Sequence, residues 1–117
     1  MTHSKSVRLR VMQGDTIAFG PGKASLLQAI DRTGSISAAA REMQMSYRRA
    51  WLLVEEMNRC FNQPLVATAT GGAKGGGASI TPMAREVLSC YQHMQKKADS
   101  AIQKDMQHLL SLIVEKN

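Results

Sequence analysis

The sequence lacks any run of about 18 apolar residues, the length that a membrane-spanning helix needs. Its first ten residues, MTHSKSVRLR, also lack the apolar stretch of a secretory signal peptide. We therefore expect no membrane partner and a cytoplasmic location. Cysteine is scarce, and both Cys60 and Cys90 lie in apolar helical patterns. In that compartment we expect them to be reduced packing residues rather than a disulfide.

Patterns typical of catalysis, metal binding and nucleotide binding are missing as well. The histidines His3, His93 and His108 are too scattered to hold a metal ion. No nucleophile, base and orienting partner occur at an interpretable spacing. The glycine-rich stretch GGAKGGGAS at 71–79 does not have the order G-x-x-x-x-G-K-[ST] of a phosphate-binding loop. The sequence thus predicts no enzyme activity, no catalytic residues, no metal and no cofactor.

Positive charge is present in excess, and it is concentrated in the first part of the chain. Fifteen Lys and Arg stand against nine Asp and Glu, a formal net charge of +6. Residues 1–81 hold ten basic and five acidic side chains, whereas residues 82–117 hold five and four. This distribution favours a polyanionic partner, nucleic acid ahead of membrane, bound by the first part. A length of 117 residues allows one domain with a modest core.

The first part reads as a β-hairpin followed by three helices. Apolar and polar residues alternate over 7–12 and again over 16–19, where Ile17 and Phe19 share a face, with a turn at 13–15 between them. A helix is predicted from 21 to about 32, with Gly34 as its stop. Two further helices are predicted over 36–43 and 47–61, capped by Ser35 and Ser46 respectively.

The second part reads as another hairpin followed by one long helix. LVATAT at 65–70 and ASIT at 78–81 would pair across a glycine-rich tip. Pro82 opens a helix that no Gly or Pro interrupts up to Asn117, roughly 50 Å in length. One small core cannot cover such a helix, and its apolar stripe predicts a homodimer interface made of Val87, Tyr91, Met94, Ala98, Ile102, Met106, Leu109 and Ile113.

The second and third predicted helices have the spacing of a helix-turn-helix, in which the second of the two enters the DNA major groove. Ala40 lies where the helices would cross closely. The third helix begins with Arg48 and Arg49, in the turns that reach base edges. Arg48 is our first choice for a base reader, because its planar fork can bond guanine O6 and N7 together. The alternative is that this arginine pair is merely a solvated surface charge.

The second hairpin would then be a wing beside the helix-turn-helix. Its glycines let backbone amides approach phosphates, and Lys74 adds a cation, although a simple surface loop is the alternative. The fold class predicted is therefore mainly α with small β: a winged helix-turn-helix with an N-terminal β-hairpin and a long C-terminal dimerisation helix. Within one structural domain, residues 1–81 form the DNA-binding head and 82–117 the dimerisation helix. The predicted DNA-binding residues are Ser35, Ser37, Ser46, Tyr47, Arg48, Arg49, Lys74, Gly75 and Gly76.

The stretch from about 20 to 92 resembles the N-terminal DNA-binding domain of the molybdate-responsive ModE transcription regulators. The most specific pieces are SISAAA at 35–40, SYRRAW at 46–51, EMN at 56–58 and ATGGAKGGGASIT at 69–81. LysR-type regulators share a GSISAAA-like helix. The resemblance implies a winged helix-turn-helix dimer on a palindromic promoter site, with residues 46–49 contacting DNA and Lys74 in the wing.

Two departures from the family pattern lead to further expectations. Gln44 stands in the turn where many such motifs have glycine, so we expect a slightly different bend. Full-length family members bind molybdate in additional β-rich domains, whereas this sequence ends at Asn117 within the last predicted helix. We therefore expect no direct molybdate sensing. The chain would be either a free-standing, ligand-independent DNA binder or a domain that takes its signal from a separate sensor protein.

The leading hypothesis is a homodimeric, sequence-specific regulator that binds double-stranded DNA. One alternative is a non-specific architectural DNA-binding protein, whose binding would be indifferent to sequence and steeply lost with salt. Another is a protein-interaction module whose long helix pairs with a different protein.

Overall fold

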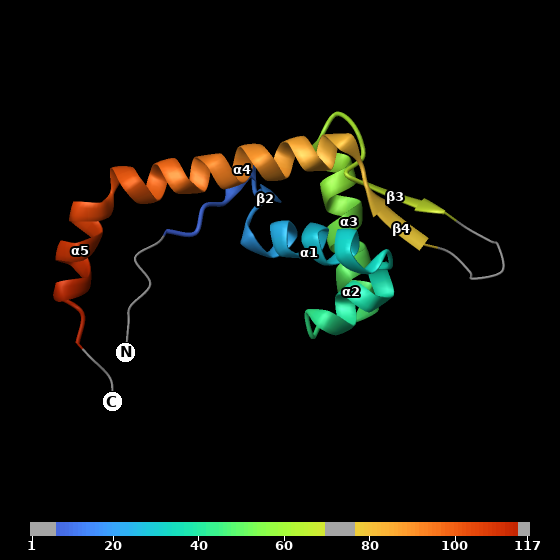
Figure 1. Ribbon diagram of the computed structural model, residues 1–117, viewed down its shortest axis with the longest axis horizontal. Coiled ribbons are helices and arrows are strands. Elements are labelled where there is room, and N and C mark those ends of the chain that lie inside the picture. The colour runs from blue at the N-terminus through green and yellow to red at the C-terminus, as the bar shows by residue number, and fades with distance from the viewer. Residues whose placement is uncertain (1–6, 70–76, 115–117) are drawn as a thin grey trace.

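The computed structural model describes residues 7–69 and 77–114 (Figure 1). A β-hairpin precedes three helices, a second hairpin follows them, and a long helix lies along one edge of the resulting head before turning into a shorter last helix. This confirms the predicted winged helix-turn-helix, mainly α with small β. The elements are β1 Val11–Gln13, β2 Thr16–Phe19, α1 Pro21–Thr33, α2 Ile36–Glu42, α3 Tyr47–Cys60, β3 Val66–Ala69, β4 Gly77–Ile80, α4 Pro82–Ala101 and α5 Gln103–Ser111.

The first hairpin is present, but its first strand is shorter than predicted. β1 begins at Val11, and residues 7–10 form no strand but bond to side chains of α4 instead. The amide of Val7 donates to Asp99 Oδ1 at 2.8 Å, and the hydroxyl of Tyr91 donates to the carbonyl of Leu9 at 2.7 Å. The alternating pattern predicts strand pairing, whereas the partners of these backbone groups are side chains of α4.

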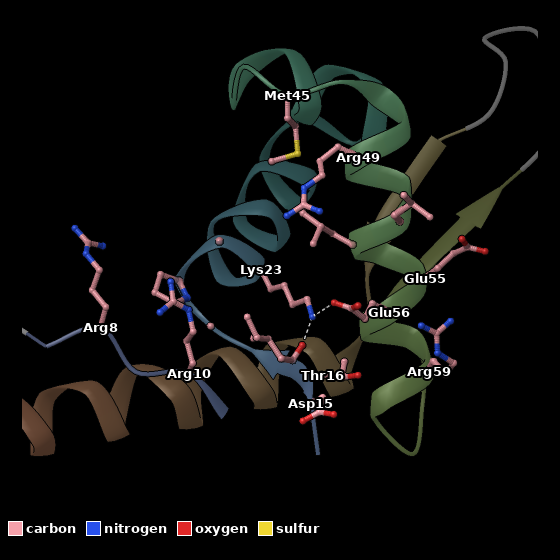
Figure 2. Close-up of a pocket in the computed structure, with 16 residues that line it drawn as sticks. Arg8, Arg10, Asp15, Thr16, Lys23, Met45, Arg49, Glu55, Glu56 and Arg59 are labelled. Atoms are coloured by element: carbon pink, nitrogen blue, oxygen red, sulfur yellow. Dashed lines mark hydrogen bonds and ion pairs between the residues drawn. The ribbon is translucent and has the colours of Figure 1, made fainter. Parts of the chain in front are cut away.

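α1 crosses the middle of the head. Pro21 stands in its first turn, and Gly34 ends it with φ of 71°, its amide bonded to the carbonyl of Ile30. Lys23 is buried near the start of α1, where its ammonium donates to the carbonyl of Ile17 and pairs with Glu56 of α3 (Figure 2). A lysine is fully buried only when it is paired, so this contact fixes the hairpin, α1 and α3 relative to one another.

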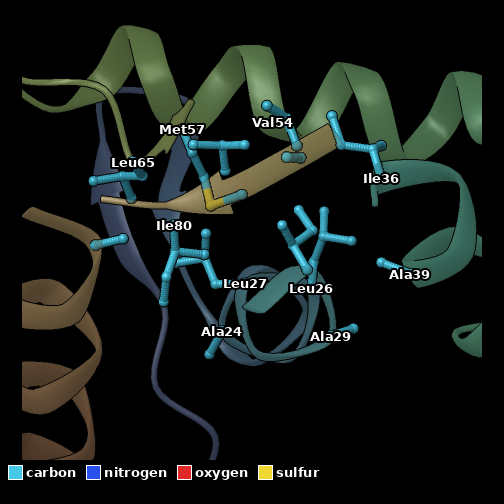
Figure 3. Close-up of a cluster of buried hydrophobic side chains, with 14 of the residues drawn as sticks. Ala24, Leu26, Leu27, Ala29, Ile36, Ala39, Val54, Met57, Leu65 and Ile80 are labelled. Carbon is cyan, nitrogen blue, oxygen red and sulfur yellow. The ribbon is translucent and has the colours of Figure 1, made fainter. Parts of the chain in front are cut away.

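The core lies where α1 faces α3 and the second hairpin (Figure 3). Leu26, Leu27 and Ile30 of α1 are fully buried, as the predicted face requires. They pack with side chains of α2, α3 and the second hairpin, among them Ile36, Val54, Met57, Leu65 and Ile80. On the other side, Phe19 meets the rings of Phe61 and Tyr91 edge to face, at centroid distances of 6.1 and 5.1 Å. One core therefore joins the two hairpins, α1–α3 and the first half of α4.

The last helix is not continuous, which corrects the prediction of a single helix from 82 to 117. α4 ends at Ala101, Ile102 takes φ of −102° and ψ of 8°, and α5 turns away from the axis of α4 (Figure 1). No residue of α5 is buried. Helix stability in proteins comes mainly from packing of an apolar face, and within the described residues α5 buries no face that would hold it in line with α4. Cys90, expected to be a packing residue, is exposed on α4.

Candidate nucleic-acid interface

The turn between α2 and α3 brings the two helices into close contact. Ala39, Ala40 and Ala50 are fully or almost fully buried at this crossing, so only small side chains separate the backbones. Gln44 adopts φ of +58°, and the neighbouring Met45 amide bonds to the carbonyl of Ala40 at 3.0 Å. The expected change of bend is therefore not needed, because Gln44 itself takes the left-handed conformation for which glycine is usual.

Capping serines define the beginnings of α2 and α3. Ser35 Oγ accepts from the amide of Ala38 at 3.1 Å, and Ser46 Oγ accepts from the amide of Arg49 at 3.0 Å. Each hydroxyl still has its own proton to donate, so a cap does not prevent a contact with phosphate. The caps fix where α3 starts and hence how far its first side chains project.

The first turns of α3 project cations and aromatic rings outward. Arg48 and Arg49 are exposed, and neither forms an ion pair with any residue in the described ranges. Tyr47 and Trp51 are stacked one turn apart, with ring centroids 6.5 Å apart and planes at 6°, and Tyr47 keeps 55% of its surface exposed. Large exposed aromatics beside unpaired arginines are typical of a contact surface rather than of a solvated face.

A cavity of about 350 Å³ separates the start of α3 from the second hairpin. It brings together three of the predicted DNA-binding residues, Ser35, Ser37 and Tyr47, and adds Trp51. Its far wall is made by β3 and β4 of the hairpin, including Thr68 and Gly77. Arg48 and Arg49 do not line it, and Arg49 lines a different cavity on the other flank of α3.

Hydrogen bonds to backbone groups of the second hairpin fix its base to the head. Asn58 of α3 accepts from the amides of Leu65 and Val66 at 2.8 and 3.1 Å and donates to the carbonyl of Val66 at 3.2 Å. The amide of Ala78 donates to the carbonyl of Gly34 at 2.9 Å, which joins β4 to the turn before α2. The hairpin therefore leaves the head in a defined direction beside α3. Its predicted DNA contacts, Lys74, Gly75 and Gly76, lie outside the described residues.

The described ranges contain no cluster of three or more His, Cys, Asp or Glu that could hold a metal ion. Within the same ranges, no helix is both long and apolar enough to cross a bilayer. Burial raises the pKa of Tyr91 above its ordinary value, and Arg10 and Arg8 partly oppose this. Neither Tyr91 nor these arginines belong to the surface formed by α3 and the wing.

The arrangement of α2, α3 and hairpin can be compared with known protein families. Residues 23–85 match the bacterial regulatory helix-turn-helix proteins of the lysR family. The chain belongs to this family. The matched residues run from the first turn of α1 to the first turn of α4, so the lysR-family region holds the helix-turn-helix together with its wing.

Curated relatives include proteins named for molybdenum. The molybdenum-pterin-binding protein MopB of Rhodobacter capsulatus is 44% identical over 81 residues, which are 69% of this chain and 30% of that protein. The molybdenum transport protein ModE of Azotobacter vinelandii is 35% identical, over 73% of this chain and 32% of the relative. The DNA-binding transcriptional dual regulator ModE of Escherichia coli K12 is 38% identical, over 73% and 34%. The chain thus spans about a third of the length of these relatives.

The structure gives each residue of one motif in this lysR-family domain a physical role that the sequence alone did not indicate. In EMN at 56–58, Glu56 neutralises the buried Lys23, Met57 is fully buried in the core, and Asn58 holds the base of the wing. Sequence reasoning missed Trp51 as a surface residue as well. The signal for it was present, since a tyrosine four residues before a tryptophan places the two rings together on a helix.

The predicted dimer-interface residues divide into three groups by their exposure. Tyr91 is buried within its own chain and Val87 packs against the core, so both are largely used inside one protomer. Met94, Leu109 and Ile113 are exposed by 41, 57 and 52%. Ala98, Ile102 and Met106 are half-buried. Because the helix breaks at Ile102, the stripe does not run along one straight axis.

Proposed function

We propose that this chain is a sequence-specific regulator of transcription that binds double-stranded DNA as a homodimer. The observation that supports this most is the exposed start of α3, where Arg48 and Arg49 stand free of ion pairs in the described ranges and a firmly anchored wing lies alongside. In this arrangement α3 enters the major groove and the wing follows the phosphate backbone.

Each predicted contact then has a distinct role. Arg48 reads a guanine by a bidentate contact, which is worth about 1–3 kcal/mol of discrimination against another base. Arg49 and Tyr47 lie beside it on the same turns. Polar groups at the helix starts and in the wing hold phosphates and set the register, namely Ser35, Ser37, Ser46, Lys74, Gly75 and Gly76.

The dimer forms through the apolar surface of α4 and α5 that the chain leaves exposed. Met94, Leu109 and Ile113 supply that surface, and Leu112 adds to it with 66% of its area exposed. Burying such a surface against a second copy is favourable by about 25 cal/mol for each Å² removed from water. The two copies of α3 would lie one helical turn of DNA apart, roughly 34–36 Å, or a multiple of it. The operator would therefore be a palindrome.

The names of the relatives support a role of this chain in regulating genes of molybdenum metabolism. DNA binding by this chain does not itself require molybdate, because within the described ranges nothing covers the first turns of α3 that a ligand would have to displace. We propose that a separate sensor protein carries a molybdenum signal to the chain.

Selection of bound sequences from a random duplex pool tests the proposal directly. The purified chain is used at about 0.15 M salt without molybdate, because affinities at low salt exaggerate backbone contacts. An enriched palindrome supports the homodimeric regulator. Retention of DNA without any enriched motif would replace it with a non-specific architectural protein. No retention at all, together with a monomer in solution, would favour an interaction module.

A further inference from the structure

A second cavity, of about 730 Å³, lies between the N-terminal segment, the first turn of α1 and α3 (Figure 2). It shares no lining residue with the cavity beside the wing. Its volume is in the range of small-molecule sites, roughly 300–1,000 Å³. The proposed contacts to DNA leave most of this cavity unused, since Arg49 is the one residue that belongs both to those contacts and to the cavity lining.

Four arginines line the cavity from two separate walls. Arg8 and Arg10 come from the N-terminal segment, and Arg49 and Arg59 come from α3. In the described ranges, none of the four takes part in an ion pair, whereas Arg32 and Arg85 elsewhere on the head do. All four are exposed, so water hydrates them, and what sets them apart is that they line one concavity together.

Acidic side chains in the same lining do not cancel this charge. Glu56 is neutralised by Lys23, which leaves Asp15 and Glu55 against the four arginines. The start of α1 adds to the positive potential, because Gly20 provides no side-chain cap and the first turn holds no acidic residue. A Cβ on Gly22 would meet nothing within 4 Å, so this turn is open toward the cavity.

The remaining wall of the cavity is apolar. Met45, Leu52 and Leu53, from the α2–α3 turn and α3, line it, and Leu52 is 46% exposed. A cationic concavity with one apolar wall suits an organic molecule that carries negative groups at its ends. The guanidinium fork matches phosphate in geometry, and two walls of arginines fit more than one phosphate group.

We propose that this cavity binds a small molecule bearing two or more phosphate groups. The site requires no DNA and stands independently of the regulator proposed above. If that proposal also holds, a bound anion would change the charge around Arg49 and Leu52, which follow Arg48 on α3. The ligand would then alter DNA affinity from the side of α3 opposite the wing cavity.

Titration of the full chain with inorganic pyrophosphate, without DNA, tests the site. The measurement is the shift of backbone amide signals by ¹H–¹⁵N NMR at a constant ionic strength of about 0.15 M. We expect saturable shifts centred on Gly20, Gly22 and Arg49. The double variant Arg10→Gln/Arg59→Gln should weaken binding at least about tenfold, because each guanidinium lost removes charge-assisted hydrogen bonds.

A matched control removes the same charge from the other end of α1. Arg32→Gln/Arg85→Gln eliminates two exposed arginines that pair with Glu42 and Asp31, and it should bind pyrophosphate like the unchanged chain. The spectra of both variants report directly whether the fold is kept. Equal weakening in both, or shifts that never saturate, would overturn the proposal. If the cavity variant lost DNA affinity while the unchanged chain bound no pyrophosphate, these arginines would be contacts to the DNA backbone, and the small-molecule site would be rejected.

Discussion

Lys23 and Glu56 form an ion pair that joins the first turn of α1 to the middle of α3. Lys23 has only 4% of its side chain exposed, whereas Glu56 keeps 34%. Glu56→Ala therefore leaves a buried ammonium without its partner, and we expect a loss of about 2 kcal/mol or more in the free energy of unfolding. This is below the 3–5 kcal/mol typical of fully buried pairs, because water reaches Glu56.

Comparing Lys23→Met with Glu56→Ala separates the effect of the buried charge from that of the packed lysine stem. It removes the buried charge and keeps a long apolar chain, and the remaining carboxylate of Glu56 can be hydrated. We expect the smaller loss of stability for Lys23→Met, measured by urea denaturation of both proteins. A larger loss than for Glu56→Ala would show that packing of the lysine stem, rather than its charge, matters here.

Gln44 stands in the left-handed region with φ of +58°. This conformation costs a non-glycine residue about 1–2 kcal/mol of stability. Glycine avoids that cost but loses more backbone entropy on folding, so the net gain is smaller. We expect Gln44→Gly to raise the free energy of unfolding by about 0.5–1 kcal/mol. Gln44→Val, with its branched Cβ, should lower it. Thermal melts of the two variants give opposite shifts if the backbone conformation is as described.

Asn58 connects α3 to the base of the wing through three hydrogen bonds. Asn58→Ala leaves the amides of Leu65 and Val66 unsatisfied at a buried position, which costs about 1–3 kcal/mol for each unsatisfied group. Asn58→Asp keeps an acceptor for both amides and should be milder. Hydrogen exchange of these two amides should accelerate in the alanine variant far more than exchange in α1. Uniform acceleration throughout the head would mean global destabilisation instead of a loosened wing.

Arg48 and Lys74 should respond differently to substitution. Arg48→Ala is expected to relax base preference at one operator position, whereas Lys74→Ala should weaken binding to all sequences and lower the salt slope by about one unit. Trp51 is the single tryptophan and lies in the candidate interface, so its fluorescence can follow both titrations. Identical behaviour of the two variants would contradict the division into base reader and phosphate contact.

Tyr91 makes the free energy of unfolding depend on pH in the alkaline range. Burial raises its folded-state pKa above 10.0, so the folded chain holds the phenolic proton more tightly than the unfolded chain does. This contribution is complete below pH 10 and declines as the pH rises through the raised pKa. Tyr91→Phe loses the bond to the carbonyl of Leu9, about 1 kcal/mol near neutral pH. The stability difference between the two proteins should shrink above pH 10, measured by denaturant unfolding at several pH values.

Local signals in the sequence were sufficient for most of the head. Gly34 and the two capping serines mark helix ends through conformations and hydrogen bonds that depend on their immediate neighbours. Alternation over 16–19 and the hydrophobic face of α1 likewise depend only on spacing. These elements lie where they were predicted because nothing distant in the chain competes with the local preference.

Contacts between distant residues could not be read in the same way. Residues 7–10 show the alternation of a strand, yet their partner is α4, more than eighty positions away. No Gly or Pro near Ile102 indicates that the helix breaks there. A continuous helix would need packing along α5, and no residue of α5 is buried. The paired Lys23 and Glu56 are 33 positions apart, so neither residue signals the other.

The attachment of residues 7–10 to α4 has a consequence for synthesis of the protein. Val7 meets Asp99 across 92 positions, and Phe19 gains one of its two aromatic neighbours only with Tyr91. A nascent chain emerges from the ribosome amino end first and folds domain by domain. Residues 7–10 therefore emerge well before their partners on α4, and the head can close only after most of α4 has been translated.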